Sequence, residues 1–156
     1  MIEIRPPTPS EFTQMYDLRW QILRKPFGLP RGSEQDDKED EGCHCVAVDQ
    51  HKIVGCARLT RHSANVGKIN CVVVHPHYRK KGIGRKLLSQ LHQQAKKIGL
   101  TSVILDTRRS AEGFYRKLGY TAAGDYFKYH FNATKSLLNK PMKLDIDYLE
   151  ITATPK

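Results

Sequence analysis

The sequence lacks any long hydrophobic run. No apolar stretch approaches the roughly 20 residues that a transmembrane helix needs, so we expect no membrane partner. The N-terminus also lacks the cationic start and apolar core of a secretion signal, which predicts a cytoplasmic protein. The nucleotide-binding patterns Gly-x-Gly-x-x-Gly and Gly-Lys-Ser/Thr are missing as well. Their absence argues against a dinucleotide-binding fold and a phosphate-loop NTPase.

Cysteines are few, and they are not arranged for zinc. Cys43-His44-Cys45 is the one cluster that suggests a metal, but no second pair follows at a zinc-ligand spacing. On a strand, Cys43 and Cys45 would share one face and His44 would occupy the other. We therefore expect ordinary buried thiols, a reducing compartment and no metal.

Acidic residues are outnumbered, with 16 Asp and Glu against 26 Lys and Arg, for a formal charge of +10. Six of the acids lie in residues 34–41. The pattern predicts a mobile, solvated segment there; the functional alternative is a lip that attracts a cationic substrate. The basic surplus elsewhere permits nucleic-acid binding. However, the chain has no helix-turn-helix, zinc-finger or RNA-binding sheet motif, so we expect no nucleic-acid partner.

A length of 156 residues with 39% hydrophobic residues suits one globular domain, residues 1–156. Hydrophobic periodicity predicts strands at 2–5, 43–48, 53–59, 69–74, 102–106, 126–129 and 142–146, and helices at 10–24, 83–98 and 110–118. In the first of these helices Ser10 is the expected N-cap, and Ser110 is the expected N-cap of the last. Residues 130–141 show no clear pattern. The order of elements favours a mixed sheet with helices on both faces, an α/β layered fold.

The most informative stretch is residues 68–98. A Val-rich strand ends at His75-Pro76, a basic loop containing Gly82 and Gly84 follows, and an amphipathic helix begins at Ile83. A helix start presents unpaired N–H groups and partial positive charge, and glycine lets an anion approach the backbone closely. The stretch predicts a pyrophosphate-binding loop. The alternative is a helix N-terminus with a solvated basic patch.

Two blocks carry a family resemblance. Arg-x-x-Gly-x-Gly at 79–84, after a Val-rich strand and before a long helix, resembles the acetyl-CoA loop of the Gcn5-related N-acetyltransferase (GNAT) superfamily. Ala-Glu-Gly-Phe-Tyr-Arg-Lys-Leu-Gly-Tyr at 111–120 resembles its last helix, in the family's order and spacing. The resemblance implies a mixed, mostly antiparallel sheet of six to seven strands with a splayed central strand pair. It also implies transfer of acetyl from acetyl-CoA to the amine of a small molecule by direct attack.

The resemblance assigns roles by position. The implied coenzyme-binding residues are Val72, Val73, Val74, Arg79, Lys80, Lys81, Gly82, Ile83, Gly84 and Arg85. Tyr115 occupies the tyrosine position that lies near the coenzyme sulfur in the family, which implies a proton donor to the leaving thiolate. A phenol has a reference pKa of about 10 and stays protonated at neutral pH. The alternative role for Tyr115 is an aromatic core residue.

Within the superfamily, residues 18–24 and 107–115 are most similar to glyphosate N-acetyltransferase-type enzymes. That likeness implies that Arg24 and Arg108 hold an anionic group of the substrate, since guanidinium matches carboxylate and phosphonate. Asn70 stands where the group has a further substrate-binding arginine. The alternative is that Arg24 merely ends a helix and Arg108 faces the coenzyme.

The likeness to glyphosate N-acetyltransferase-type enzymes identifies no general base in this chain. Asn139 stands three residues before Met142, where the group has a catalytic histidine, and asparagine is no base at neutral pH. A water relay, His62 or His130 are the alternatives. The missing base also favours another class of function, a non-catalytic acyl-CoA-binding regulator. Acetylation of a protein amine is a further alternative, and the family's frequent dimers raise the question of a homodimer.

Overall fold

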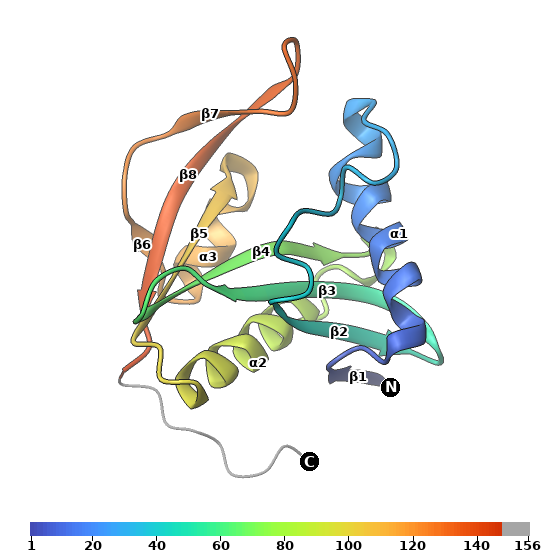
Figure 1. Cartoon of the computed structure of the whole chain (residues 1–156), viewed down its shortest axis with the longest axis horizontal. Coiled ribbons are helices and arrows are strands. Elements are labelled where there is room, and N and C mark those ends of the chain that lie inside the picture. The colour runs from blue at the N-terminus through green and yellow to red at the C-terminus, as the bar shows by residue number, and fades with distance from the viewer. Residues whose placement is uncertain (148–156) are drawn as a thin grey trace.

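The computed structural model describes residues 1–147, and its centre is a mixed sheet of eight strands (Figure 1). The strands follow the order β1-β2-β3-β4-β5-β8-β6, with β7 paired to β8. Only β4 and β5 are parallel, which confirms a mostly antiparallel sheet. The bounds are Ile2–Arg5 (β1), Cys43–Asp49 (β2), Lys52–Arg61 (β3), Val66–Val74 (β4), Ser102–Arg108 (β5), Thr121–Ala122 (β6), Phe127–His130 (β7) and Ser136–Asp145 (β8). The strand count exceeds the predicted six to seven because β8 is long enough to pair with both β6 and β7.

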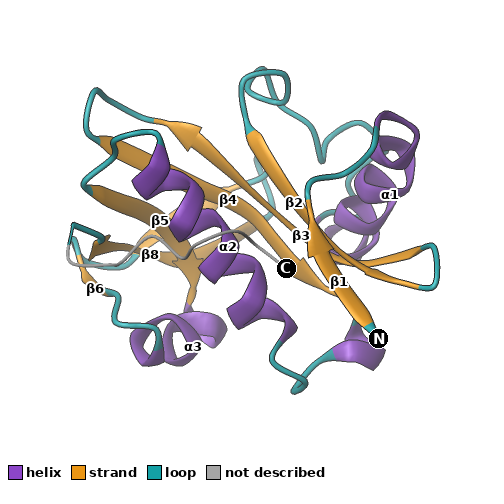
Figure 2. Ribbon diagram, turned by 90° about the horizontal axis from the view of Figure 1, so that it is seen from below, coloured by secondary structure: helices purple, strands orange, loops and turns teal. Residues whose placement is uncertain are grey.

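The helices cover both faces of the sheet, as predicted. Helix α1 (Phe12–Leu23) lies on one face, and α2 (Ile83–Lys97) and α3 (Glu112–Lys117) lie on the other (Figures 1 and 2). The α2 face holds the larger core, in which Leu87 and Leu88 are fully buried. Fully burying a leucine side chain contributes about 1.5–3 kcal/mol. This core anchors α2, and with it the loop that precedes it.

Short 3-10 turns precede two helices, so the predicted caps are wrong in detail. Before α1, the turn Pro9–Glu11 begins at Thr8, whose N–H donates to the Glu11 carboxylate at 2.8 Å. The Glu11 N–H donates to the Thr8 carbonyl at 2.9 Å, so Thr8 performs the role predicted for Ser10. Before α3, the turn Arg109–Ala111 includes Ser110.

The splayed strand pair implied by the resemblance is present. Strands β4 and β5 pair only between residues 66–68 and 102–104, although both continue for several residues beyond. Next to the splay, β4 is bulged, because its register with β3 shifts between Cys56 and Arg58. Cys71, at the bulge, has φ = 59°, a left-handed conformation that costs a non-glycine residue about 1–2 kcal/mol. The splay and the bulge together open the sheet at one place.

The acidic run at 34–41 is only partly solvated: most of its residues are exposed, as expected, but Glu34 and Glu39 are buried. Glu39 is 8% exposed and accepts hydrogen bonds from Arg19 Nη1 at 2.8 Å and Arg58 Nη1 at 2.7 Å. Arg58 also donates to Asp36 at 2.7 Å. Both arginines are almost fully buried, and a buried charge needs a nearby counter-charge. The run is therefore drawn over the sheet to neutralise Arg19 and Arg58.

None of the helices within residues 1–147 is long and apolar enough to cross a membrane.

Candidate active site

Two adjoining cavities, of about 610 and 720 Å³, lie along the splay. The first lies between β4, β5 and the end of α1, and the second between the end of β4, the loop at 79–85 and α3. Five residues line both: Val72, Val74, Arg79, Ala111 and Tyr115. The shared lining makes the two cavities one continuous groove through the opened sheet.

The basic loop lines the second cavity. Gly82 is the N-cap of α2 with φ = 78°, and Lys80 also has a positive φ of 62°. The first N–H groups of α2 follow directly, and such groups have no partner within their helix. The cations that line this cavity are Arg79, Lys80, Arg85 and Lys117. The loop thus combines free backbone donors with concentrated positive charge, as a site for phosphate groups requires.

Two residues of the loop differ from the expectation that they serve only to bind the coenzyme. Lys81 does not line the cavity; its ammonium lies 5.7 Å from the centre of the Tyr78 ring instead. Gly84 lines it, but a Cβ there would lie 3.1 Å from the Phe114 ring. The small size of Gly84 therefore also serves the packing of α2 against α3, a requirement that the sequence pattern did not reveal.

The β4 bulge faces the first cavity. Cys71 and Val72 have no Cα partner in the register with β3, and they line the cavity together with Val73 and Val74. The Val73 side chain is 2% exposed and packs toward α1, so only its backbone is available to a ligand. Backbone N–H groups that are not paired with a neighbouring strand can bind and polarise a carbonyl group.

Tyr115 projects from α3 where the two cavities meet. Its ring makes edge contacts with Phe114 at 5.0 Å and with Tyr120 at 5.6 Å between centroids. Within residues 1–147 its hydroxyl forms no hydrogen bond. Burial raises the pKa of the phenol above its usual value, so the hydroxyl keeps its proton. Tyr115 is thus a core aromatic residue that also lines both cavities and keeps its hydroxyl proton.

Arg108 lies in the first cavity, and Arg24 lies near it without lining the cavity. Arg24 donates to the carbonyls of Ser33 at 3.0 Å and Leu23 at 3.1 Å. Burial together with the nearby charge of Arg24 lowers the pKa of Arg108. Arg24 lies 5.5 Å from the Phe131 ring and Arg108 lies 5.2 Å from the Phe27 ring. These two rings stack on each other at 4.8 Å. Among the described residues neither arginine forms an ion pair, so two neighbouring cations lack a counter-charge.

Among the residues of the first cavity that sequence reasoning missed, Asp106 carries the one carboxylate. It alternates on β5 with the buried Leu105 and Thr107, a pattern that could have marked it as facing the open side. Its carboxylate lies 3.4 Å from the ammonium of Lys68. Asn70, for which substrate binding stays a prediction, lines the same cavity. His62 and His130, the alternatives for a base, line neither cavity and are exposed.

Asn139 lies beside this cavity on β8, directly across from Arg108 on β5. It is 9% exposed, and its Oδ1 atom has no hydrogen-bond partner in the described part of the chain.

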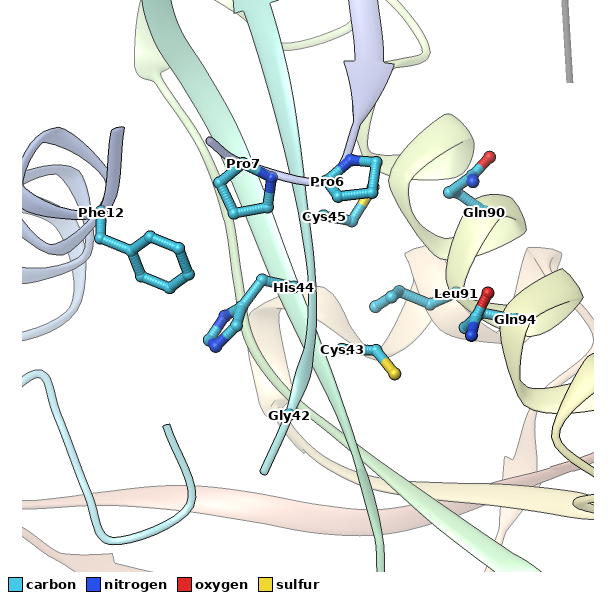
Figure 3. Close-up of a pocket in the computed structure, with 10 residues that line it drawn as sticks. All are labelled: Pro6, Pro7, Phe12, Gly42, Cys43, His44, Cys45, Gln90, Leu91 and Gln94. Carbon is cyan, nitrogen blue, oxygen red and sulfur yellow. The ribbon is translucent and has the colours of Figure 1, made fainter. Parts of the chain in front are cut away.

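A third cavity, of about 340 Å³, lies between the start of β2 and α2, away from the basic loop (Figure 3). Cys43 and Cys45 turn toward α2 and His44 turns the opposite way, as the strand pattern predicted. Nε2 of His44 donates to the Glu39 carbonyl at 2.8 Å and Nδ1 lies 3.3 Å from Arg19, while burial lowers the pKa of the imidazole. All four cysteines are free thiols. With His44 occupied, this cavity presents no evident catalytic group.

Comparison with known proteins agrees with this geometry. Residues 12–120 match the model of the acetyltransferase (GNAT) family. A Bacillus subtilis protein described as an uncharacterised N-acetyltransferase is 31% identical over 111 residues, 71% of this chain and 79% of the relative. The chain therefore belongs to the GNAT family of acetyltransferases.

Two further similarities concern proteins with stated activities. The amino-acid acetyltransferase of Proteus mirabilis is 34% identical over 93 residues, which are 60% of this chain but only 21% of that protein. The crystal structure of an aminoglycoside 6'-N-acetyltransferase complexed with coenzyme A superimposes with a TM-score of 0.75, covering 99% of both chains at 18% identity. The structural likeness concerns the fold.

Proposed function

We propose that this protein transfers the acetyl group of acetyl-CoA to the amine of a small molecule. The observation that carries the proposal is the continuous groove, which has the basic loop at one end, the bulged and splayed strands in the middle and Tyr115 at the junction. These residues fit acetyl-CoA: cations and helix N–H groups for its phosphates, released backbone groups for its acyl arm, and a hydroxyl without a partner for its sulfur.

Each part of the groove has a task in this reaction. Bound acetyl-CoA supplies the thioester, whose C–S bond breaks as the amine nitrogen forms the new C–N bond. The loop at 79–85 holds the phosphates, and the backbone of residues 72–74 orients the acyl arm and polarises its carbonyl group. Tyr115 donates its proton to the departing sulfur, a step in which a well-placed acid contributes about 10²–10⁴-fold.

The pair of arginines supports an acceptor that carries a negative group. Two guanidinium groups that lie close together without a counter-ion repel each other, and a carboxylate or phosphonate would relieve that repulsion. The likeness of residues 18–24 and 107–115 to glyphosate N-acetyltransferase-type enzymes points the same way. A polyamine-like acceptor has weaker support, because Asp36 and Glu39 of the acidic run are already paired with Arg58 and Arg19.

The test is calorimetric titration with acetyl-CoA, followed by a panel of amines monitored for free thiol. The panel contains amino acids, aminoalkyl phosphonates, polyamines, an aminoglycoside and a peptide N-terminus. Thiol release on one amine class supports the transferase and identifies its substrate class. Replacing Arg108 with Gln should then raise the KM of the acidic amines and leave acetyl-CoA affinity unchanged. Failure to bind acetyl-CoA would refute the proposal.

Tight acetyl-CoA binding without turnover on any amine would favour the alternative, a non-catalytic acyl-CoA-binding regulator. The free hydroxyl of Tyr115 argues against that alternative, since a pure binding protein has no use for a proton donor at the junction. One acetyltransferase domain over residues 1–156, a cytoplasmic location and a homodimer stay predictions.

A further inference from the structure

We propose that Asp106 is the general base, and that it receives the ammonium group of an amino-acid-like acceptor whose negative group binds Arg108 and Arg24. This inference rests on the proposed function. An alkylamine is an ammonium ion at neutral pH and cannot attack a thioester until it loses a proton. A group at the junction of the groove must therefore accept that proton.

The lining of the groove leaves one candidate for this role. Among the described residues that line the two cavities, Asp106 is the only carboxylate, and none is a histidine. The other lining groups that titrate as acids are Cys71, Tyr78 and Tyr115. Burial raises the pKa of Cys71 and Tyr115, and the hydrogen bond to Asp49 raises the pKa of Tyr78, so all three keep their protons. The remaining ionisable side chains are the cations of the loop, Lys117 and Arg108. Asp106 is therefore the one carboxylate available as a proton acceptor among the described residues of the groove.

The fork between β4 and β5 positions Asp106 for the acceptor. The paired region of the two strands ends at Lys68 and Ile104, so Asp106 lies just beyond the point where the strands part. Its side chain is 33% exposed, and Lys68, on the last paired rung, holds its carboxylate at 3.4 Å. The carboxylate is thus fixed by a neighbour and still open to the cavity.

The spacing along β5 suggests the acceptor's shape. Asp106 and Arg108 are two residues apart on one strand, so their side chains share a face with Cα atoms about 7 Å apart. A negative site and a positive site at this separation fit a small zwitterion, with its ammonium group toward the fork and its acid group toward the arginines. Amino acids and aminoalkyl phosphonates have this arrangement.

The proton movements balance. Asp106 takes one proton from the ammonium group, directly or through one water molecule, and frees the nitrogen lone pair. The nitrogen then forms the C–N bond while the C–S bond breaks and Tyr115 protonates the sulfur. The second proton of the nitrogen restores the Tyr115 hydroxyl, and Asp106 releases its proton to solvent. The net products are the amide, the free thiol and one proton.

The test compares Asp106→Asn with a matched control, Asp145→Asn, which changes an exposed aspartate on β8 outside both cavities. Each protein is titrated with acetyl-CoA and assayed for thiol release with two acceptors: the best amine of the panel, and an analogue of it that carries several fluorines on the β carbon, one carbon removed from the carbon that bears the nitrogen. The fluorinated amine is largely neutral at the assay pH and needs no prior deprotonation.

We expect Asp106→Asn to keep its acetyl-CoA affinity and to lose about 10²-fold or more of kcat/KM with the basic amine, the range typical of a general base. With the fluorinated amine the loss should be at least tenfold smaller. Asp145→Asn should match the wild type with both. An equal loss with both amines would make Asp106 a structural residue and overturn the inference.

Full activity of Asp106→Asn would also overturn the inference, but it would leave the proposed function standing. If the wild-type protein binds acetyl-CoA but releases no thiol with any amine, the proposed function and this inference fall together.

Discussion

Replacing Glu39 with Gln should destabilise the fold by several kcal/mol, although Glu39 lies outside the groove. The carboxylate accepts from Arg19 at 2.8 Å, from Arg58 at 2.7 Å and from the Asp36 N–H at 3.1 Å. Arg58 keeps Asp36 as a partner in the variant, but Arg19, which is 0% exposed, retains no acidic partner among the described residues. Breaking a buried ion pair by removing one partner costs about 3–5 kcal/mol.

Urea denaturation measures this cost. With an m-value of about 2 kcal/mol/M, the midpoint should fall by about 1.5–2.5 M while m stays unchanged. The control is Glu41→Gln, a member of the same acidic run whose side chain is 62% exposed and which should change stability by less than about 0.5 kcal/mol. Adding Arg19→Met to Glu39→Gln should recover part of the loss, because the uncompensated charge is then gone.

A fall in the midpoint of less than about 0.3 M for Glu39→Gln would refute this reasoning. The acidic run would then not be held by Arg19 and Arg58, and its interpretation as a neutralising segment would be wrong.

Three further predictions concern the groove and the core. Tyr115→Phe should lower kcat by about 10²-fold and change acetyl-CoA affinity less than twofold, as measured by thiol release and calorimetry. Gly82→Ala should weaken acetyl-CoA binding about tenfold, because φ = 78° strains alanine by about 1–2 kcal/mol at the start of α2. His92 is buried against the Tyr120 hydroxyl at 2.6 Å, and burial lowers its pKa from 6.5 to about 4. Its contribution to stability should therefore be complete above pH 6.5 and decrease by about 3 kcal/mol as the pH falls to 4.

Each of these predictions has a control or a contradicting outcome. Unchanged turnover in Tyr115→Phe would make the residue a core aromatic and nothing more. Gly99→Ala adds a similar strain, at φ = 87°, at the end of α2 remote from the groove, and should lower stability without affecting acetyl-CoA affinity. A His92→Gln variant should lack the loss of stability between pH 6.5 and 4; an identical pH dependence in both proteins would show that other groups cause it.

Local pattern was enough to predict most of the elements. The stripe of apolar residues in α2 and the Val-rich strand before it are properties of neighbouring residues, and they appear in the structure close to their predicted bounds. The ends of the helices were less predictable. Thr8 and Ser10 are both good N-cap residues, and only the contact with Glu11 distinguishes them. The segment at 130–141 lacked a local pattern because it comprises a hairpin tip and the first half of β8, which is held by pairing with β5 and β7.

For this protein, the sequence alone determined the family, the basic loop and the position of Tyr115, since each depends on residues that are close together in the chain. Only the tertiary structure decided which partners Glu39 and Asp106 meet. Glu39 reaches arginines 20 and 19 positions away, and Asp106 meets a lysine 38 positions earlier. The charge of a side chain can be read from the sequence, but its partner is set by which strands pair and where they part.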